Sequence, residues 1–350
     1  DIRIQASITD LSSSRAGQLS EYLSTKKNRT AYARQIASWA TNAGVDGVDL
    51  DMENFAFNDD RDTWAVTKDR WVKFIDVLGE TLRQNGLTLS ATVPGGWATS
   101  SPSTGYWVYA WDEIIDDIDR LIIMAYDYSW NIPGAIGPND WAERVVQRAI
   151  TDVGEANAPK IWIGTPQYGR NWIRVADGKP VTVGNCPNSW TPDASQTRIT
   201  VTPASALDVA AREGVEPTWN PTQGEWSFRY NRKTAGTANG KGRECTVQRE
   251  VWFADTRSAL ARATLVPNNG IGGIAVWNFG NVQSDFYPRL AEYGRKIAPA
   301  PLDLSVSVNK RTTYGGKTKI TIKAGSAKGA PAGAKVTIRW APGTTKDQTA

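Results

Sequence analysis

The sequence contains no histidine and only two cysteines among its 350 residues. Without histidine, the chain cannot use Ser-His-Asp or Cys-His catalysis, and it cannot bind a metal through imidazole. Two cysteines, Cys186 and Cys245, are too few for a thiolate metal site. They suit either one disulfide, as in a secreted protein, or two buried thiols, and the sequence alone favours neither. We therefore expect no metal and no other cofactor.

Long apolar runs and an even spread of charge are also missing. No stretch of about 18 apolar residues occurs, so we expect no membrane span. Residues 301–350 hold nine Lys/Arg and two Asp/Glu, whereas residues 1–300 hold 31 basic and 34 acidic residues. A nucleic-acid interface needs stacking aromatics on a basic face, and this basic segment offers only Tyr314 and Trp340, so we expect no nucleic-acid partner. The positive charge of this segment could attract an anionic cell wall, or it could simply belong to a solvated surface.

What the sequence does contain is an alternation of short β-branched runs and longer amphipathic stretches, which is typical of α/β proteins. Strands are predicted at residues 2–8, 45–53, 87–93, 120–127, 160–169 and 270–280. Helices are predicted at 29–43, near 111–119, over 141–150, over 255–264 and along the apolar stripe Trp71, Phe74, Ile75, Leu78 and Leu82. The strands are mostly apolar, as in a parallel sheet that is buried on both faces.

Most of these strands end in polar or aromatic residues, namely Asp51/Glu53, Tyr126/Asp127, Gln167/Tyr168 and Trp277/Asn278. Functional residues at the carboxyl ends of parallel strands are typical of a (β/α)8 barrel or a doubly wound sheet. No Gly-x-Gly-x-x-Gly follows any predicted strand, so the sequence favours a TIM-type barrel. Such a barrel needs eight strands, and only six are predicted.

The domain organisation follows from changes in composition along the chain. We expect the barrel over residues 1–297, with a polar, Gly- and Pro-rich insertion at about 171–250 that precedes the last strand and holds both cysteines. The run "APAP" (298–301) predicts a short stiff linker. Residues 302–350 alternate apolar and polar residues between Gly-rich turns, which indicates the start of an all-β, immunoglobulin-like sandwich.

The predicted strand at 45–53 is unusual because it contains Asp46, Asp49, Asp51 and Glu53. Side chains alternate along a strand, so Asp49, Asp51 and Glu53 share one side, opposite Val48, Leu50 and Met52. A solvated edge strand fits poorly, because the interleaved residues and the neighbouring strands are apolar. A calcium loop would carry oxygen ligands around a glycine bend, which a strand pattern does not provide. The pattern therefore predicts three carboxylates lined up toward the mouth of the barrel.

Three neighbouring acids repel one another, so we expect at least one raised pKa. Glu53 is outermost, and a carboxylic acid that stays protonated is a general acid. Ordinary retaining glycosidases place two carboxyls about 5–5.5 Å apart across the scissile bond, whereas residues i and i+2 of one strand point the same way. Asp51 is therefore a poor nucleophile. The strand suits a scheme in which the substrate's 2-acetamido carbonyl attacks the anomeric carbon and a carboxylate orients the amide.

The motif D-G-V-D-L-D-M-E (46–53) resembles the signature D-G-x-D-x-D-x-E of family 18 glycoside hydrolases, the chitinases and related N-acetylglucosaminidases. The segments "MAYD" (124–127), "IGTPQYGR" (163–170) and "GIAVWNFG" (273–280) agree with that family in order. The resemblance covers roughly residues 1–295. It aligns "IRIQASI" with the family's third strand, which implies a (β/α)8 barrel that lacks its first two βα units in this chain.

The resemblance also implies roles for individual residues. Glu53 would be the acid/base, Asp51 would orient the acetamido group, and Asp49 would share a proton with Asp51. Tyr126 would hydrogen-bond the acetamido carbonyl, and Asp46 would support the strand. The expected substrate-binding residues are Asp127 in the same pocket, Trp277 under the −1 sugar, and Trp97, Gln167 and Tyr168 after other strands. Of Trp97, Trp107, Trp111, Trp130, Trp172 and Trp277, we expect at most half to contact sugar.

The segments 126–150 and 251–263 are similar to the bacterial subgroup of spore-cortex-lytic and other peptidoglycan-directed N-acetylglucosaminidases. The resemblance therefore implies hydrolysis of N-acetylglucosamine polymers, either chitin or peptidoglycan, by a secreted or cell-wall-associated protein. The basic C-terminal segment is a candidate for association with the wall. A catalytically inactive lectin of the same family is the alternative, and the presence of Glu53, Asp51 and Tyr126 favours the enzyme.

Overall fold

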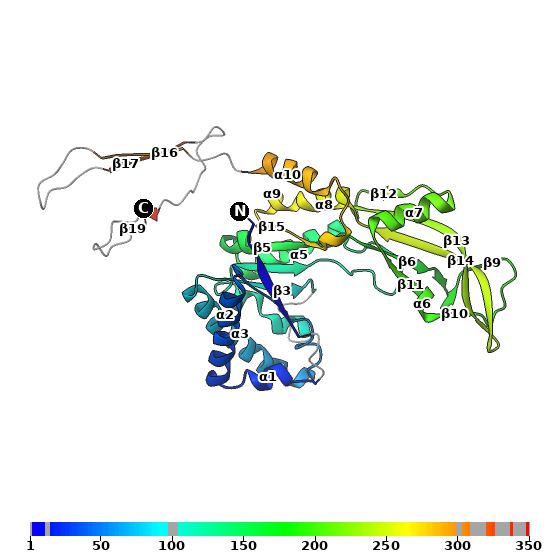
Figure 1. Cartoon of the computed structure of the whole chain (residues 1–350), viewed down its shortest axis with the longest axis horizontal. Coiled ribbons are helices and arrows are strands. Elements are labelled where there is room, and N and C mark those ends of the chain that lie inside the picture. The colour runs from blue at the N-terminus through cyan, green and yellow to red at the C-terminus, as the bar shows by residue number, and fades with distance from the viewer. Residues whose placement is uncertain are drawn as a thin grey trace, which may run out of the picture. The chain divides into compact units, whose positions relative to one another are not determined.

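The computed structural model of the chain describes residues 2–10, 15–96, 104–298, 303–308, 320–325, 337–338 and 348–349. The chain divides into two compact units, Asp1–Ala291 and Glu292–Ala350. The first unit contains two large β-sheets, with helices that cover them, and a small two-stranded sheet (Figure 1).

A curled parallel sheet forms the centre of the first unit. Its strands, in spatial order, are β1 (Gln5–Thr9), β2 (Gly47–Asp51), β3 (Thr88–Pro94), β4 (Arg120–Met124), β5 (Ile161–Pro166) and β15 (Gly273–Trp277). Every neighbouring pair is parallel. These are the six predicted strands, and within the described residues β1 and β15 do not pair with each other, so the sheet forms a half-barrel.

Helices lie between these strands in the chain, and the longest of them bury apolar residues in the core that they share with the sheet. These helices are α1 (Gln18–Tyr22), α2 (Lys26–Ala43), α3 (Trp64–Gln84) with η1 (Arg61–Thr63) before it, α5 (Asn139–Val153), η3 (Glu155–Lys160), α8 (Thr256–Ala263) and α9 (Leu265–Asn269). The predicted stripe of α3 is buried, and the helix ends where Gly86 adopts a left-handed conformation with φ of 71°. The helices α2, α3, α5 and α8 thus confirm the helices predicted from the sequence, whereas α9 was not predicted.

The helix predicted near 111–119 is wrong in its length. The structure has η2 (Gly105–Tyr109) followed by the short helix α4 (Trp111–Ile114). The chain then turns toward β4, where the Asp119 carboxylate accepts a hydrogen bond from the Leu89 backbone N–H at 2.8 Å. Aspartate has a low helix propensity, and the three aspartates at 116, 117 and 119 favour this early end.

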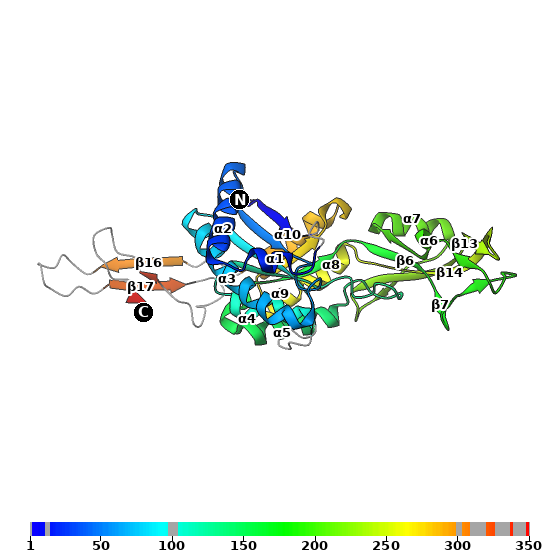
Figure 2. The same cartoon turned by 90° about the horizontal axis from the view of Figure 1, so that it is seen from below.

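A second, antiparallel sheet occupies the predicted insertion. Its main path is β10 (Thr191–Pro192), β13 (Glu225–Ala238), β14 (Lys241–Phe253), β6 (Gly169–Ile173) and β11 (Arg198–Val201). The short strands β12 (Thr218–Asn220) and β9 (Thr182–Val183) pair at its sides, β7 (Val175–Ala176) pairs with β8 (Lys179–Pro180), and α6 is Ala194–Thr197. Helix α7 (Pro203–Glu213) lies across one face of this sheet (Figure 2), where its Ala206 and Ala210 pack against Phe228 and Phe253.

The insertion begins earlier than the sequence indicates, because the predicted strand at 160–169 is two strands. Strand β5 ends at Pro166, and β6 begins at Gly169 in the other sheet, so Gln167 and Tyr168 lie at the junction. Gly169 has no room for a side chain, since a Cβ there would come within 2.3 Å of the Trp252 carbonyl. This close approach lets β6 pair with β14 from Gly169 onward. The inserted sheet ends at Phe253, the last residue of β14.

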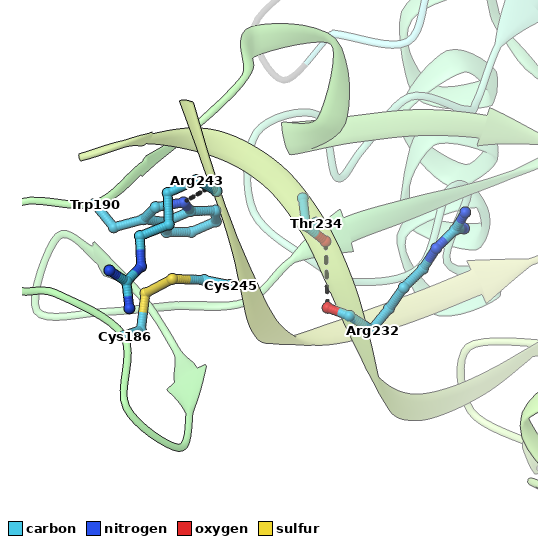
Figure 3. Close-up of a disulfide and its surroundings, with 6 residues drawn as sticks. All are labelled: Cys186, Trp190, Arg232, Thr234, Arg243 and Cys245. Atoms are coloured by element: carbon cyan, nitrogen blue, oxygen red, sulfur yellow. Dashed lines mark hydrogen bonds between the residues drawn. A yellow bond between two sulfur atoms is a disulfide. The ribbon is translucent and has the colours of Figure 1, made fainter. Parts of the chain in front are cut away.

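Cys186 and Cys245 form a disulfide within the inserted sheet (Figure 3). Cys245 lies on β14 opposite Thr234 of β13, and Cys186 lies in the segment that follows β9. Trp190 packs in the same small core and donates its indole N–H to the Arg243 carbonyl at 2.9 Å. The structure thus adopts the first of the two alternatives that the sequence leaves open.

Replacing both cysteines by serine should lower the free energy of unfolding by about 3–4 kcal/mol. The bond spans 59 residues, so its loss returns a large loop-closure entropy to the unfolded chain. Urea denaturation of the double variant, with and without a reductant, measures this loss. Reductant should destabilise the wild type to the level of the variant and leave the variant unchanged, with Ser195→Ala as a control in the same insertion. Equal midpoints for oxidised and reduced wild type would contradict the expectation.

The second unit contains short antiparallel strand pairs after the end of α10 (Phe286–Ile297). Strand β16 (Asp303–Val308) pairs with β17 (Ile320–Gly325), and β18 (Thr337–Ile338) pairs with β19 (Gln348–Thr349). These strands coincide with the alternating segments of the sequence. The immunoglobulin-like sandwich itself, and the linker at 298–301, stay predictions.

Candidate active site

Asp49 and Asp51 of the D-G-V-D-L-D-M-E motif lie on the face of the parallel sheet that is turned away from the helices. On β2, Val48 and Leu50 are fully buried in the core that α2 and α3 share with the sheet, whereas Asp49 and Asp51 are half-buried. Asp51 stands in register with Thr9 of β1 and Thr92 of β3. Because side chains alternate along a strand, the two carboxylates project from the opposite, concave face.

Glu53 lies just beyond the strand, not on it. Strand β2 ends at Asp51, two residues before the predicted end, because the Glu53 backbone N–H donates to the Asp10 carboxylate at 2.8 Å instead of continuing a strand ladder. The alternation nevertheless continues, since Met52 is buried and Glu53 is exposed. Exposure therefore increases along the row from Asp49 to Glu53, which places Glu53 nearest the solvent.

Asp49 is the innermost acid and is held by its neighbours on two strands. The Thr92 hydroxyl donates to both Asp49 carboxylate oxygens, at 3.1 and 2.9 Å. Burial raises the pKa of Asp49 to about 6, while the Thr92 hydrogen bonds and the Arg120 charge lower it. Asp49 thus titrates close to neutral pH in the middle of the sheet.

Asp51 carries an unusual buried oxygen. Its Oδ1 atom is shielded from solvent and has no hydrogen-bond partner among the described residues. Burial is the largest cause that raises the Asp51 pKa to about 6, and the charges of Asp49 and Asp10 add to it. A buried carboxylate oxygen without a donor is costly, so this atom suits a ligand that brings an N–H or O–H group.

The predicted rise in pKa is confirmed for all three acids. Partial burial raises the pKa of Glu53, and the charges of Asp51, Asp10 and Asp127 raise it further. Burial, rather than mutual repulsion, is the largest cause for each acid. Glu53 therefore keeps its proton to a higher pH than an ordinary glutamate, as a general acid requires.

Tyr126 and Asp127 follow β4 and lie beside the acids of β2. Asp127 adopts a left-handed conformation with φ of 58°, which costs energy for a residue with a Cβ. The Tyr168 hydroxyl donates to the Asp127 carboxylate, and Arg170 forms an ion pair with it at 2.6 Å. The Tyr126 ring meets the Tyr168 ring edge-on at 6.4 Å. Residues from β4 and the β5–β6 junction thus form one polar cluster.

The inserted sheet and α8 hold the loop that carries Tyr126 and Asp127. Glu225 of β13 is buried and accepts the backbone N–H groups of Ile136 and Gly137 at 2.8 and 2.6 Å. Arg262 of α8 is also buried and donates to the carbonyls of Ala125 and Gly137. Burial raises the Glu225 pKa to about 7, although both N–H groups and the Arg262 charge lower it. These long-range contacts fix both ends of the loop.

A cavity of about 350 Å³ opens beside Glu53 and this loop. Its walls include Glu53, Tyr106, Tyr126, Asp127, Tyr128 and Trp141. The volume lies in the usual range for small-ligand sites, and aromatic walls with a few carboxyl and hydroxyl groups are typical of them. The structure therefore brings Glu53, Tyr126 and Asp127 together at one cavity, with Asp49, Asp51 and Tyr168 beside them.

The other predicted site residues are less central. Trp277 ends β15 and is 54% exposed, so its ring is accessible, but it does not line this cavity. The Gln167 side chain is fully buried and donates to the carbonyls of Pro166 and Asp255. Asp46 lies at the opposite end of β2 and accepts the Ile4 backbone N–H at 2.7 Å, which ties β2 to the residue before β1. Trp97 lies outside the described residues.

The remaining tryptophans named from the sequence divide between core and surface. Trp111 and Trp172 are only 1% and 2% exposed and belong to cores. Trp130 is exposed between the guanidinium groups of Arg170 and Arg198, which lie 4.1 and 4.0 Å from its ring centre. Trp107 is half-buried under the Lys68 ammonium group. Of the six tryptophans named from the sequence, the structure thus leaves Trp107, Trp130 and Trp277 accessible.

Sequence reasoning missed Asp10, Thr92 and Arg170. Asp10 follows the carboxyl end of β1, where a polar residue after a strand is the signal that identified the other sites, but the predicted strand stopped at residue 8. Thr92 was hidden inside an apolar strand, and only the register of β3 against β2 reveals its contact with Asp49. Arg170 ends the segment "IGTPQYGR", and its partner Asp127 lies 43 residues earlier in the sequence.

Within the residues that the structure describes, no three or more His, Cys, Asp or Glu side chains are placed to hold a metal ion together. In the same part of the chain, no helix combines the length and apolar character that crossing a membrane requires.

The chain is similar to several known proteins. The chain is 24% identical to chitotriosidase-1 of Mus musculus over 285 residues, covering 74% of the chain and 54% of that protein. It is 28% identical to the cortical fragment-lytic enzyme of Bacillus cereus over 254 residues, covering 71% of the chain and 50% of that enzyme. The chain thus spans about half the length of these curated relatives.

The crystal structure of the Bacillus cereus spore cortex-lytic enzyme SleL has the same fold, with a TM-score of 0.64 at 24% identity, covering 82% of this chain and 58% of that one. The model of glycosyl hydrolases family 18 matches residues 1–281, which include the parallel sheet and the inserted antiparallel sheet. The chain therefore belongs to glycosyl hydrolases family 18.

Proposed function

We propose that this site hydrolyses β-1,4 linkages in polymers of N-acetylglucosamine, with retention of configuration and with the substrate's acetamido group as the nucleophile. The observation that best supports this mechanism is the buried Asp51 Oδ1 atom, which has no donor among the described residues. The N–H of a 2-acetamido group is a suitable donor for it. Glu53 comes next along the same face, where the leaving oxygen of the substrate would lie.

In the first step, the acetamido carbonyl oxygen forms a bond to the anomeric carbon while the glycosidic carbon–oxygen bond breaks. Glu53 gives its proton to the leaving oxygen, for which its raised pKa prepares it. In the second step, water attacks the anomeric carbon from the leaving-group side, Glu53 takes a proton from that water, and the oxazolinium ring opens. Two inversions at the same carbon leave the β configuration of the product.

Asp51 and Tyr126 would hold the acetamido group during both steps. The Asp51 carboxylate accepts the amide N–H and stabilises the positive oxazolinium ion. Burial raises the pKa of Tyr126 above its ordinary value, so its hydroxyl remains a donor for the acetamido carbonyl at neutral pH. Asp49 precedes Asp51 by two residues on the same face and also has a pKa of about 6, so we propose that the two carboxyls share a proton.

The proposed substrate-binding residues extend from this centre. Trp277 presents an exposed indole for stacking under the −1 sugar, and Asp127 lines the cavity beside Glu53. Tyr168 reaches the site through Asp127. For Gln167 we keep only a supporting role at the junction of the two sheets, because its side chain is fully buried. Trp97 stays a prediction from the sequence.

Two polymers present the required sugar, chitin and the glycan strands of peptidoglycan. The matched relatives include a chitotriosidase and cortical fragment-lytic enzymes, so we propose both polymers as substrate candidates. The disulfide supports secretion, because such bonds persist in oxidising compartments. We also propose that residues 302–350 form a β-sandwich module whose basic charge favours association with the cell wall.

The anomer of the first product tests the proposed function. The protein should release β-anomeric N-acetylglucosamine ends from chitin oligosaccharides or from purified peptidoglycan, as followed by ¹H NMR before mutarotation. The faster substrate identifies the polymer. First-formed α product would overturn retention, and binding without any release of product from either polymer would identify a lectin.

A further inference from the structure

Asp10 links the end of β1 to the turn that carries Glu53. Its carboxylate accepts the Glu53 backbone N–H at 2.8 Å and the Asn54 backbone N–H at 3.0 Å from each oxygen. The side chain is 6% exposed, so these charge-assisted hydrogen bonds are largely shielded from water. Because β1 and β2 are parallel and Thr9 is in register with Asp51, Asp10 reaches the turn directly after the last paired residue.

The same turn is also held from its other side. The Tyr109 hydroxyl, from η2, donates to the Met52 carbonyl at 2.8 Å. Tyr109 is buried and its ring meets Phe55 edge-on at 5.1 Å, so its hydroxyl has a fixed position. Tyr109 and Asp10 thus bind the two ends of the same peptide group, between Met52 and Glu53, and Asp10 also binds the next one. A side chain on a turn needs this kind of support to act with the accuracy of one on a strand.

We propose that Asp10 is a positioning residue for the hydrolysis proposed above: it fixes the backbone of the 52–54 turn and thereby aims the Glu53 carboxyl at the leaving oxygen. This inference rests on the proposed function of Glu53. Asp10 accepts the Glu53 backbone N–H and does not bind the Glu53 side chain through this bond. The Glu53 carboxyl therefore stays free to exchange its proton with the substrate.

A second consequence follows from the charge of Asp10. The groups that face Glu53 are Asp51 on β2, Asp127 after β4, Tyr126, Tyr109 and Asp10 itself. Of these, the three carboxylates raise the Glu53 pKa, in the order Asp51, Asp10 and Asp127. Glu53 must be protonated to act as the acid, so activity falls as the pH rises through its pKa. Neutralising Asp10 lowers that pKa and moves this fall to lower pH.

The test compares Asp10→Asn with Asp10→Ala. The asparagine keeps an oxygen for the backbone N–H groups and removes the charge, so kcat at the optimum should fall less than about threefold. At pH 8 its activity should fall about three- to tenfold further, because the basic limb of the pH profile moves down. The alanine releases the turn and should lower kcat about 10- to 100-fold with KM changed less than about threefold.

Asp119→Asn is the matched control, because Asp119 also accepts a backbone N–H between neighbouring strands, at the opposite end of the sheet. It should leave both kcat and the pH profile unchanged. Urea denaturation of each variant separates a loss of folded protein from a loss of kcat. Asp10→Asn and Asp10→Ala variants with wild-type kcat and wild-type pH profiles would overturn the inference.

A readout without turnover distinguishes failure of this inference from failure of the proposed function. The ¹³C resonance of the Glu53 carboxyl, followed by NMR against pH, should titrate at lower pH in Asp10→Asn than in the wild type. An unmoved titration in an active enzyme would refute the role of Asp10 alone. A moved titration in a protein that releases no product would support the contact and reject the hydrolytic function.

Discussion

Glu53→Gln should remove nearly all hydrolysis, with kcat lowered by about 10³-fold or more, while oligosaccharide binding stays within about threefold of the wild type. Glutamine has the same shape but cannot give a proton to the leaving oxygen or take one from water, so both steps lose their acid/base. Binding persists because Glu53 is an exposed group at the edge of the cavity and makes its backbone contact through its N–H. Initial rates on chitin oligosaccharides and calorimetric titration of the same ligands measure the two quantities.

The matched control for this variant is Glu143→Gln on the exposed face of α5, which should change neither quantity. Together the two variants separate a change in net charge from a change at the site. Activity undiminished by Glu53→Gln would assign the proton transfer to another group. The remaining acids at or beside the cavity would then be Asp127, Asp51 and Asp49, and the mechanism proposed here would be rejected.

The sheet and the row of acids could be predicted because their signals are local. A period of two places Asp49, Asp51 and Glu53 on one face whatever the rest of the chain does. The same holds for the apolar stripe of α3, whose residues are all buried. Both are properties of consecutive residues, and the burial of Val48, Leu50 and Met52 follows from the same period.

The supports of the site could not be predicted, because each joins residues that are distant in sequence. Asp10 and Glu53 are 43 residues apart, and Glu225 reaches Ile136 across 89 residues. Only the order of strands in space brings such groups together. The burial of Gln167 has a similar origin, since the chain leaves one sheet for another at this residue, and no local pattern marks that departure.

Asp51→Asn should lower kcat about 10²- to 10³-fold and at the same time stabilise the fold above about pH 6. The asparagine oxygen still accepts the acetamido N–H, but a neutral side chain no longer stabilises the positively charged intermediate, which accounts for the loss of rate. The gain in stability has an independent cause in the cost of keeping a charge at this position. Kinetics therefore tests how the Asp51 charge affects the reaction rate, and urea denaturation at two pH values tests how the same charge affects stability.

The sign of the stability change follows from the raised pKa. The folded Asp51 carboxyl has a pKa of about 6 against an ordinary value of 3.8, so between these values the unfolded chain gives up the proton and the folded chain keeps it. The stability contribution of Asp51 is full below about pH 4, falls as the pH rises, and is lost above about pH 6. Asparagine does not titrate, so relative to it the wild type becomes less stable over this range.

The expected difference is about 1–2 kcal/mol in favour of Asp51→Asn at pH 7.5. Two pKa units correspond to about 2.7 kcal/mol, and the half-exposed position of Asp51 reduces this through solvent screening. The comparison at pH 4 is the internal control, since there the folded carboxyl is protonated and the unfolded one is only about half ionised, so the gain should be much smaller than at pH 7.5. A gain of the same size at pH 4 would show that the amide improves packing, and that the charge carries no folding cost. A loss of activity together with the pH-dependent gain would mean that the site keeps Asp51 charged for catalysis at the expense of stability.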